Sequence, residues 1–435
     1  MNIVVIGTGY VGLVSGACFS EFGFAVTCVD KDSEKITSLE QGQIPIYEPG
    51  LDDLVKRNSA AGRLKFTTEL GPAVSAADAV FIAVGTPTRR GDGHADLSFV
   101  FAAAEEVAAY LSSHTVVITK STVPVGTGQR VEQVIRKANP VADFDIASNP
   151  EFLREGSAIA DFMRPDRVVV GVRTQKAKDV MRQLYRPLYL IEKPVLFTDL
   201  ETAELIKYAA NAFLAVKVSY INQMADLCEK VGADVHDVAK GMGLDNRIGA
   251  KFLHPGPGYG GSCFPKDTLA LVKTAEDYDS PLSIVADVVA YNQARKWEMS
   301  KRVISAFSGN VKARKLAVLG LAFKPETDDM RESPAIEIIE ALIKSGANIT
   351  AYDPAAMTEA RPILPDNVSY ASSAQACLKG ADCAVMVTEW NEFRALTPQV
   401  FGKLLARPIL VDLRNIYDGE AMRDKGMEYH SIGRK

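Results

Sequence analysis

The sequence lacks the residue patterns that mark disulfide-rich and metal-binding proteins. Its six cysteines are widely scattered and include no Cys-x-x-Cys pair, so neither a disulfide framework nor a zinc site is expected. Its five histidines show no His-x-x-x-His spacing, and no metal is predicted. This cysteine usage is typical of reduced thiols in a cytoplasmic protein.

The sequence also lacks long apolar runs and a surplus of positive charge. No stretch reaches the roughly 18 apolar residues needed to span a bilayer. Residues 2–19 are apolar, but repeated glycines interrupt them and no basic region precedes them, which argues against a signal peptide. The net charge is −5, which disfavours a broad nucleic-acid surface. We therefore expect a cytoplasmic protein that binds neither membranes nor nucleic acids.

What the sequence does contain is apolar material for two or three domains. Of its 435 residues, 47% are hydrophobic. In the first half, short β-rich runs alternate with amphipathic stretches, starting with a strand over 3–6, a helix over 11–22 and a strand over 25–29. This alternation is typical of a parallel, doubly wound sheet.

The middle of the chain predicts one long helix. Residues 201–231 contain neither Gly nor Pro, Asp199 is a candidate N-cap, and Gly232 supplies a stop. Such a helix would be about 45 Å long. It would form either a spine between domains or a dimer interface.

The last third repeats the order of the opening. A strand over 315–320 is followed by a loop, a helix over 334–344 and a strand over 348–352 that ends at Asp353. We therefore predict an α/β protein with two Rossmann-like doubly wound domains joined by a long central helix. The predicted divisions are 1–198 for the first domain, 199–300 for a central helical region, and 301–435 for the last domain.

The opening motif predicts a dinucleotide site. Gly7, Gly9 and Gly12 form Gly-x-Gly-x-x-Gly directly after the first strand and at the start of a helix. In this motif the glycines allow a tight turn, close approach of a pyrophosphate, and helix–strand packing. Asp30 ends the second strand about 20 residues later, where a carboxylate binds a ribose and repels a 2′-phosphate. The cofactor is therefore expected to be NAD.

A glycine-rich loop at 258–262 predicts a reactive thiol. It leads to Cys263, Phe264 and Pro265, and Pro265 suits the first turn of a helix. A thiol at a helix N-terminus has a lowered pKa, which favours the nucleophilic thiolate. Lys266 and Asp267 follow within one helical turn.

With these motifs the sequence resembles the UDP-glucose/GDP-mannose dehydrogenase family over essentially its whole length. The motifs that carry the resemblance are GTGYVG at 7–12, YEPGL at 47–51, GTP at 85–87, KSTVPVGT at 120–127, NPEFLREG at 149–156, the Lys207 and Asn211 pair, RIG at 247–249, the cysteine loop, Phe323-Lys324 and RES at 331–333.

The resemblance implies an NAD-dependent, four-electron oxidation of a nucleotide sugar, from primary alcohol to carboxylate. UDP-glucose is the expected substrate and UDP-glucuronate the expected product. Cys263 would form a thiohemiacetal, which a second NAD oxidises to a thioester that water cleaves. A homodimer or higher oligomer is also implied. So are NAD binding in the region 1–198, dimerisation and the catalytic cysteine loop in 199–300, and UDP-sugar binding in 301–435.

The resemblance also implies roles for further residues. Lys207 and Asn211, four apart on one helix face, would hold the developing oxyanion. Asp267 would activate the hydrolytic water with Thr122, and Glu151 would act as acid or base. The implied cofactor-binding residues are Gly7, Gly9, Tyr10, Val11, Gly12, Asp30, Lys35, Thr86, Thr122, Glu155, Lys266 and Arg331. The implied substrate-binding residues are Glu151, Phe152, Leu153, Arg154, Glu155, Lys207, Asn211, Arg247, Phe252, Leu253, His254, Pro255, Gly256, Gly260 and Lys324, with Arg247 reaching the ligand of a partner subunit.

Three alternatives remain open at the level of the sequence. The same chemistry could act on GDP-mannose, because base recognition is not readable from the motifs. A two-electron β-hydroxyacid-type dehydrogenase would share the long helix and the Lys/Asn pair but would not need Cys263. A non-catalytic NAD-binding protein would bind the dinucleotide without turning over a nucleotide sugar.

Overall fold

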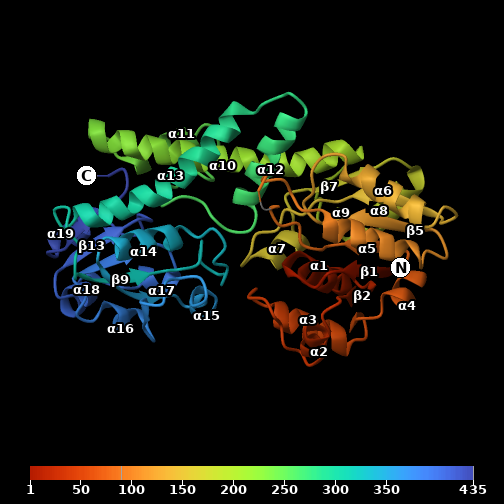
Figure 1. The fold of residues 1–435 in the computed structure, drawn as a ribbon, viewed down its shortest axis with the longest axis horizontal. Helices are drawn as coiled ribbons and strands as arrows, with labels where there is room; N and C mark the ends of the chain where they lie inside the picture. The colour runs from red at the N-terminus through yellow and green to blue at the C-terminus, as the bar shows by residue number, and fades with distance from the viewer. Residues whose placement is uncertain (90, 435) are drawn as a thin grey trace. The chain divides into compact units, whose positions relative to one another are not determined.

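The fold is described from a computed structural model, which describes residues 1–89 and 91–434 (Figure 1). Contacts within the chain divide it into two compact units. The first unit comprises Met1–Ala210 and Lys273–Ser280, and the second comprises Asn211–Val272 and Pro281–Lys435. The division into three regions at residues 198 and 300 stays a prediction.

The first unit is built on an eight-stranded sheet, counted over the described residues, with strand order β3-β2-β1-β4-β5-β6-β7-β8. Neighbouring strands run parallel except β6 and β7, which are antiparallel. The strands are β1 Asn2–Ile6, β2 Ala25–Val29, β3 Leu64–Thr67, β4 Ala79–Ile82, β5 Thr115–Thr119, β6 Phe144–Ser148, β7 Val168–Val172 and β8 Val195–Thr198.

Helices connect these strands. They are α1 Tyr10–Glu21, α2 Ser33–Glu40, α3 Leu51–Ala60, α4 Leu70–Ser75, α5 Ser98–Ala108, α6 Thr127–Ala138, α7 Ala158–Met163, α8 Gln175–Leu184 and α9 Arg186–Tyr189. Because β1 lies between β2 and β4, the strand order reverses there. In an open parallel sheet, ligands bind beyond the carboxyl ends of the strands at such a reversal.

The second unit has its own six-stranded parallel sheet within the described chain, in the order β11-β10-β9-β12-β13-β14. The strands are β9 Lys315–Leu319, β10 Asn348–Tyr352, β11 Ser369–Tyr370, β12 Cys383–Met386, β13 Ile409–Asp412 and β14 Glu428–His430. Helix α12 Phe264–Asp277 begins in this unit, and its residues from Lys273 onward are counted in the first unit. The other helices are α11 Val235–Gly243, α13 Ser283–Ser305, α14 Pro334–Lys344, α15 Met357–Ala360, α16 Ala374–Leu378, α17 Asn391–Arg394, α18 Pro398–Leu404 and α19 Gly419–Asp424.

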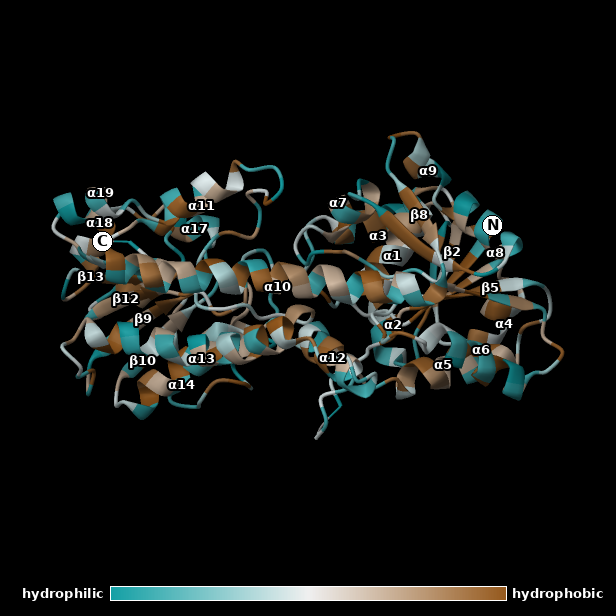
Figure 2. Ribbon diagram, turned by 90° about the horizontal axis from the view of Figure 1, so that it is seen from above, coloured by the Kyte–Doolittle hydropathy of each residue, from teal (hydrophilic) through white to brown (hydrophobic). Residues whose placement is uncertain are grey.

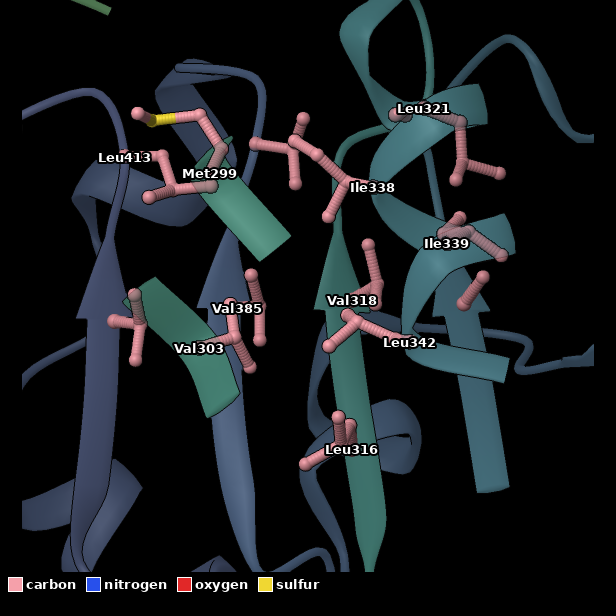
Figure 3. Packing of buried hydrophobic residues seen from close by; sticks show 14 of the residues in the cluster. Met299, Val303, Leu316, Val318, Leu321, Ile338, Ile339, Leu342, Val385 and Leu413 are labelled. Atoms are coloured by element: carbon pink, nitrogen blue, oxygen red, sulfur yellow. The ribbon is translucent and has the colours of Figure 1, made fainter. Parts of the chain in front are cut away.

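Apolar side chains from helices and strands form the core of the second unit. Met299 and Val303 of α13, with Ile338 of α14, pack with Val318 of β9 and Val385 of β12 (Figure 3). All are buried, and β-branched residues predominate in the strands. This core fixes the carboxyl ends of β9 and β12, from which the loops of the second unit depart.

The long helix α10 spans Leu200–Val231, beginning in the first unit and ending in the second. Asp199 accepts a hydrogen bond from the amide of Thr202 at 2.6 Å, and Gly232 follows the last turn with φ of 79°. Both end signals predicted from the sequence are therefore confirmed. The predicted fold class, two Rossmann-like sheets and a long central helix, is confirmed as well.

Across residues 1–89 and 91–434, no helix combines the length and apolar character needed to cross a bilayer. The six cysteines are free thiols, and five of them are buried, while Cys263 is partly exposed. The described part of the chain holds no cluster of three His, Cys, Asp or Glu side chains that would bind a metal.

Candidate active site

The glycine loop after β1 leaves the N-terminus of α1 open. Gly7 adopts φ of 95°, and a Cβ there would lie 2.7 Å from the carbonyl oxygen of Ala83. A Cβ on Gly12 would lie 1.9 Å from the carbonyl oxygen of Gly7. At Gly9, the N-cap, no side chain caps the helix, and no described atom lies within 4 Å of a Cβ position. The first turn, with Tyr10 and Val11, therefore offers backbone amides to an anion.

Asp30 ends β2 beside this loop. Its carboxylate accepts hydrogen bonds from the amide and the hydroxyl of Thr8, at 2.8 and 2.7 Å. The ammonium of Lys35 lies 3.5 Å away. Although burial by itself would raise the pKa of Asp30, the hydrogen bonds from Thr8 hold it below the ordinary value. The group is therefore an anion at neutral pH, as required to accept hydrogen bonds from a ribose.

Two threonines lie at the next strand ends. Thr86 follows β4, and its hydroxyl donates to the carbonyl oxygen of Thr122, which follows β5, at 2.9 Å. Both residues are buried. The two loops are thereby joined at the edge of the sheet where the predicted cofactor site lies.

Glu151 and Lys207 form a buried ion pair in the first unit. Their Oε1 and Nζ atoms lie 3.1 Å apart, and both side chains are at most 4% exposed. The second carboxylate oxygen of Glu151 accepts the amide of Leu153 at 2.5 Å. The ring of Phe152 lies 5.2 Å from the Lys207 ammonium. Burial strengthens the attraction between the two charges, because the surroundings have a low dielectric constant. A carboxylate and an ammonium are both groups that can exchange a proton with a substrate.

The loop after Glu151 is held by Glu48. Glu48 accepts the amides of Gly156 and Ala158 at 2.7 and 2.8 Å and also bonds the hydroxyl of Tyr10. Burial raises the pKa of Tyr10 far above its ordinary value, and the hydrogen bond to Glu48 adds to this effect. Glu155 lies in this same loop and is half-buried. The sequence predicted no role for Glu48.

Arg154, in the same loop, is engaged elsewhere. Its guanidinium makes two hydrogen bonds to Asp161, at 2.9 and 2.6 Å, and is 63% exposed. A substrate phosphate would have to compete with that carboxylate for the guanidinium.

In the second unit, Cys263 directly precedes α12. Its carbonyl oxygen accepts the amide of Asp267 at 2.8 Å, which closes the first helical turn. The hydroxyl of Ser262 lies 3.5 Å from its sulfur. The thiol therefore combines partial exposure with a position at a helix N-terminus, an arrangement that favours a nucleophilic thiolate.

Asp267 is fully buried and joins two of the predicted residues. One oxygen accepts the side-chain amide of Asn211 at 2.7 Å, and the other accepts the ammonium of Lys266 at 2.7 Å. The sequence spacing placed Asn211 on α10 and Asp267 one turn after the cysteine, and the structure brings the two together. Lys266, predicted to bind cofactor, is paired with Asp267 instead of standing alone.

The cysteine loop packs against the loop that carries Lys324 and Arg331. A Cβ on Gly260 would lie 2.2 Å from the carbonyl oxygen of Glu332, so only glycine fits. The amide of Gly261 donates to the carbonyl oxygen of Arg331 at 2.8 Å. These backbone contacts explain why the glycines are needed and bring two predicted binding loops of the second unit together.

The second loop carries two cations, Arg331 and Lys324. The guanidinium of Arg331 is 63% exposed and bonds Asp329 at 2.8 Å. The Lys324 ammonium lies 5.5 Å from the ring of Phe323. Both are placed at a loop edge where a diphosphate could be bound.

The segment 252–256 is anchored mainly through its backbone. Phe252 has φ of 65°, Leu253 is 2% exposed, and His254 is exposed. After the buried Pro255, the amide of Gly256 donates to the side chain of Asn222 at 2.8 Å.

Two arginines flank this region. Arg295 is fully buried and donates to the carbonyl oxygen of Gly256 at 2.7 Å, a role that the sequence did not predict. Arg247, predicted to reach a partner subunit, is 89% exposed and bonds Asp245 at 2.6 Å. Its exposure leaves it accessible to a neighbouring molecule.

Comparison with protein families covers most of the chain. Residues 1–189 match the NAD binding domain of the UDP-glucose/GDP-mannose dehydrogenase family, residues 201–294 its central domain, and residues 317–419 its UDP binding domain. The chain belongs to this family. The predicted resemblance and the predicted cofactor, NAD, are thus confirmed.

Individual relatives agree with this assignment. The chain is 59% identical to a UDP-glucose 6-dehydrogenase of Rhizobium meliloti (strain 1021), covering 100% of both chains. It is 48% identical to UDP-glucose 6-dehydrogenase TuaD of Bacillus subtilis (strain 168), covering 100% of this chain and 93% of the relative. The solved structure of a UDP-glucose dehydrogenase from Pyrobaculum islandicum is 36% identical and superposes with a TM-score of 0.92, covering 100% and 98% of the two chains.

Within this family assignment, the roles of individual residues stay predictions. The structure adds three buried polar residues that sequence reasoning missed: Glu48, which holds the loop after Glu151, and the hydrogen-bonded pair Lys120 and Asn149. All three lie in motifs that carried the family resemblance, YEPGL, KSTVPVGT and NPEFLREG. Their place in these motifs was the available signal.

Proposed function

We propose that this chain is an NAD-dependent UDP-glucose 6-dehydrogenase, which converts UDP-glucose, two NAD⁺ and water to UDP-glucuronate and two NADH. The observation that carries the proposal is the 59% identity, over full length, to a protein of that name. Domain matches for NAD and for UDP support both ligands.

The first unit fits NAD. The uncapped N-terminus of α1 and the clear space at Gly9 suit a pyrophosphate, and the ionised Asp30 suits an unphosphorylated ribose. Bound NAD would accept a hydride from the sugar carbon in each of two oxidations. Thr86, Thr122 and Glu155 are proposed to complete its binding, with Arg331 as a phosphate contact from the second unit.

For the first oxidation, the alcohol must lose a proton as it loses a hydride. We assign this proton to the buried Glu151–Lys207 pair. The ammonium of Lys207 and the amide of Asn211 are proposed to stabilise the oxyanion that results. Both residues project from α10, one turn apart.

For the second oxidation, the aldehyde must become a hydride donor again. The Cys263 thiolate adds to the carbonyl carbon and forms a thiohemiacetal, whose oxidation leaves a thioester. Water then attacks the thioester carbon, and the thiolate is the leaving group. Asp267 and Thr122 are proposed to hold that water, because Asp267 is buried and hydrogen-bonded at both oxygens.

We also propose that the protein is a homodimer or higher homo-oligomer in the cytoplasm. Phe213, Tyr220 and Leu227 recur every second turn of α10 and are 62%, 47% and 49% exposed. Figure 2 shows hydrophobic residues recurring along this helix. Exposed apolar stripes of this kind mark interaction surfaces. The six free thiols support a reducing compartment.

The substrate proposal is tested with a panel of nucleotide sugars. With NAD present, UDP-glucose is expected to give the highest kcat/KM, while GDP-mannose gives at least about 100-fold less. Equal or better turnover of GDP-mannose would overturn the substrate assignment. NAD binding without turnover of any nucleotide sugar would overturn the enzymatic assignment.

A further inference from the structure

Lys120 is a buried cation for which the proposed reaction has no use so far. It follows β5 directly and is only 5% exposed. Its ammonium donates to Asn149 Oδ1 at 3.0 Å and to the hydroxyl of Tyr185 at 3.4 Å, and lies 5.8 Å from the ring centre of Phe162. Within the described residues it makes no ion pair with a carboxylate.

Such an environment is unfavourable for a charge. An ammonium removed from water without a carboxylate partner loses hydration that two neutral acceptors do not fully replace. Burial lowers the pKa of Lys120 to about 8, with repulsion from Lys207 adding to the effect and attraction by Glu151 opposing it. If Lys120 only filled space between Phe162 and Tyr185, an apolar side chain would do so at lower cost.

Asn149 links Lys120 to the ion pair. Its Oδ1 accepts hydrogen bonds from the Lys120 ammonium and the Tyr185 hydroxyl. Its Nδ2 donates a hydrogen bond to the carbonyl oxygen of Val169 at 2.8 Å. Two residues further along the same loop, Glu151 accepts Lys207. Asn149 thus fixes the ammonium of Lys120 at the base of the loop that carries Glu151.

The charges around this cluster come from three elements. Glu151 follows β6, Lys207 and Glu204 lie on α10, and the phenol of Tyr185 follows α8. Burial raises the pKa of Glu204 to about 7 and that of Tyr185 above its ordinary range. Glu204 is engaged by the amides of Gly126 and Gly128. Glu151 and Lys207 pair with each other, and Glu204 accepts amides at the start of a helix. Among the described residues of this group, Lys120 is therefore the buried charge whose hydrogen-bond partners are all neutral.

We propose that Lys120 is a positioning residue of the proposed dehydrogenase reaction: held by Asn149 and Tyr185, its positive charge eases removal of a proton from the Glu151–Lys207 pair. A neighbouring positive charge favours the deprotonated state of any group it faces. The direction is the same whether the proton leaves the carboxyl of Glu151 or the ammonium of Lys207. A deprotonated pair is in the basic form that accepts the alcohol proton. The proposal therefore rests on the proposed function.

The test is the pH dependence of kcat for UDP-glucose oxidation in three variants. Lys120→Met and Lys120→Gln both remove the charge, and Gln retains a polar group that can form hydrogen bonds. Both should shift the acidic limb of the profile to higher pH by about one unit or more. Lys137→Met removes an exposed lysine of α6 as the matched control and should leave the limb where it is.

The NAD dissociation constant is measured alongside and should stay within about twofold of the parent value in all three variants, which shows that the glycine loop is intact. If either folded Lys120 variant turns over with an unshifted acidic limb, the positioning role is overturned while the proposed function stands. If the parent protein turns over no UDP-glucose, the proposed function fails and the role of Lys120 fails with it. If Met does not fold, Gln decides the result.

Discussion

The two sheets of this protein begin with the same strand–loop–helix–strand arrangement and use it differently. In the first unit, Gly7 donates its amide to the carbonyl oxygen of Val29 at 2.8 Å, with φ of 95°. In the second, Gly320 donates to Tyr352 at 2.9 Å, with φ of 93°. In each case an aspartate ends the second strand. The starting geometry is therefore nearly identical.

The two units differ in the residues after this glycine. In the first unit α1 begins three residues later, uncapped, and Asp30 is partly exposed. In the second unit α14 begins only at Pro334, and its N-cap Ser333 provides the capping hydroxyl itself. Asp353 is 1% exposed and accepts the amides of Leu321 and Ala322 as well as the indole of Trp390. The second unit thus uses the shared geometry to hold a loop, and that loop carries Lys324 and Arg331.

We propose cofactor binding in the first unit and covalent chemistry in the second, and the variant Cys263→Ala should separate the two roles most strongly. Without the thiolate no thioester can form, so UDP-glucuronate production should fall at least about 1,000-fold. The NAD dissociation constant, measured by fluorescence titration, should change less than about twofold. A variant that still releases the acid at the parent rate would contradict the assignment.

A matched pair of glycine substitutions tests the two loops directly. In Gly12→Ala the new methyl group meets the carbonyl oxygen of Gly7 at 1.9 Å, so NAD affinity should drop about 100-fold. In Gly320→Ala the methyl group meets the Cβ of Thr388 at 2.4 Å, and the unfolding free energy should fall by about 1–3 kcal/mol with NAD affinity retained. Equal loss of NAD affinity in both variants would mean that the loops do not differ in function.

The two units also cap their helices differently, and the difference should appear in how stability depends on pH. Glu204 caps α6 with a carboxylate, whereas Ser333 caps α14 with a neutral hydroxyl. The pKa of Glu204 is raised from 4.5 to about 7, so its protonated form is favoured in the folded state. Stability therefore falls as pH rises between these two values.

Glu204→Gln should remove this dependence, which we expect to amount to about 1–2 kcal/mol between pH 5 and 8. Urea unfolding at both pH values measures it. Ser333→Ala should lower the unfolding free energy equally at both pH values, so the dependence of stability on pH should not change. A parent protein whose stability rises over that range would contradict the inferred direction.

The smallest expected effect concerns the two strand-end aspartates. Asp30→Asn removes the carboxylate that repels a 2′-phosphate, so the preference for NAD over NADP should weaken by about three- to tenfold. Asp353→Asn should leave that preference unchanged and lower the unfolding free energy by about 1–3 kcal/mol, because its carboxylate holds four buried donors. Competition between the two cofactors in an initial-rate assay measures the first effect, and thermal unfolding measures the second. If Asp353→Asn also weakened the preference for NAD over NADP, the proposed difference between the two aspartates would be contradicted.

Local signals were readable from the sequence because they depend on nearby residues. The Gly7–Gly12 spacing, the caps of α10 and the position of Asp353 each required only a short segment. Short edge strands such as β3 and β14 were missed, because three or four residues show too little periodicity to stand out. Helix α1 was predicted to begin one residue later than Tyr10, an ordinary uncertainty at a helix end.

Pairings between distant residues could not be read in this way. Glu151 and Lys207 meet across more than 50 positions, as do Asn211 and Asp267. Lys120 and Glu48 were missed as contributors because lysine and glutamate are ordinarily solvated, and only the fold shows that these two are buried. The sequence indicated candidate chemical groups, while the sheet topology determines which of them touch.

One chain is expected to perform two successive oxidations on the same sugar. The most direct measurement mixes the protein with excess NAD and a limiting, known amount of UDP-glucose and counts the NADH formed at completion. Two successive oxidations should give two NADH per sugar, with UDP-glucuronate as the product. One NADH per sugar, with an aldehyde released, would contradict it.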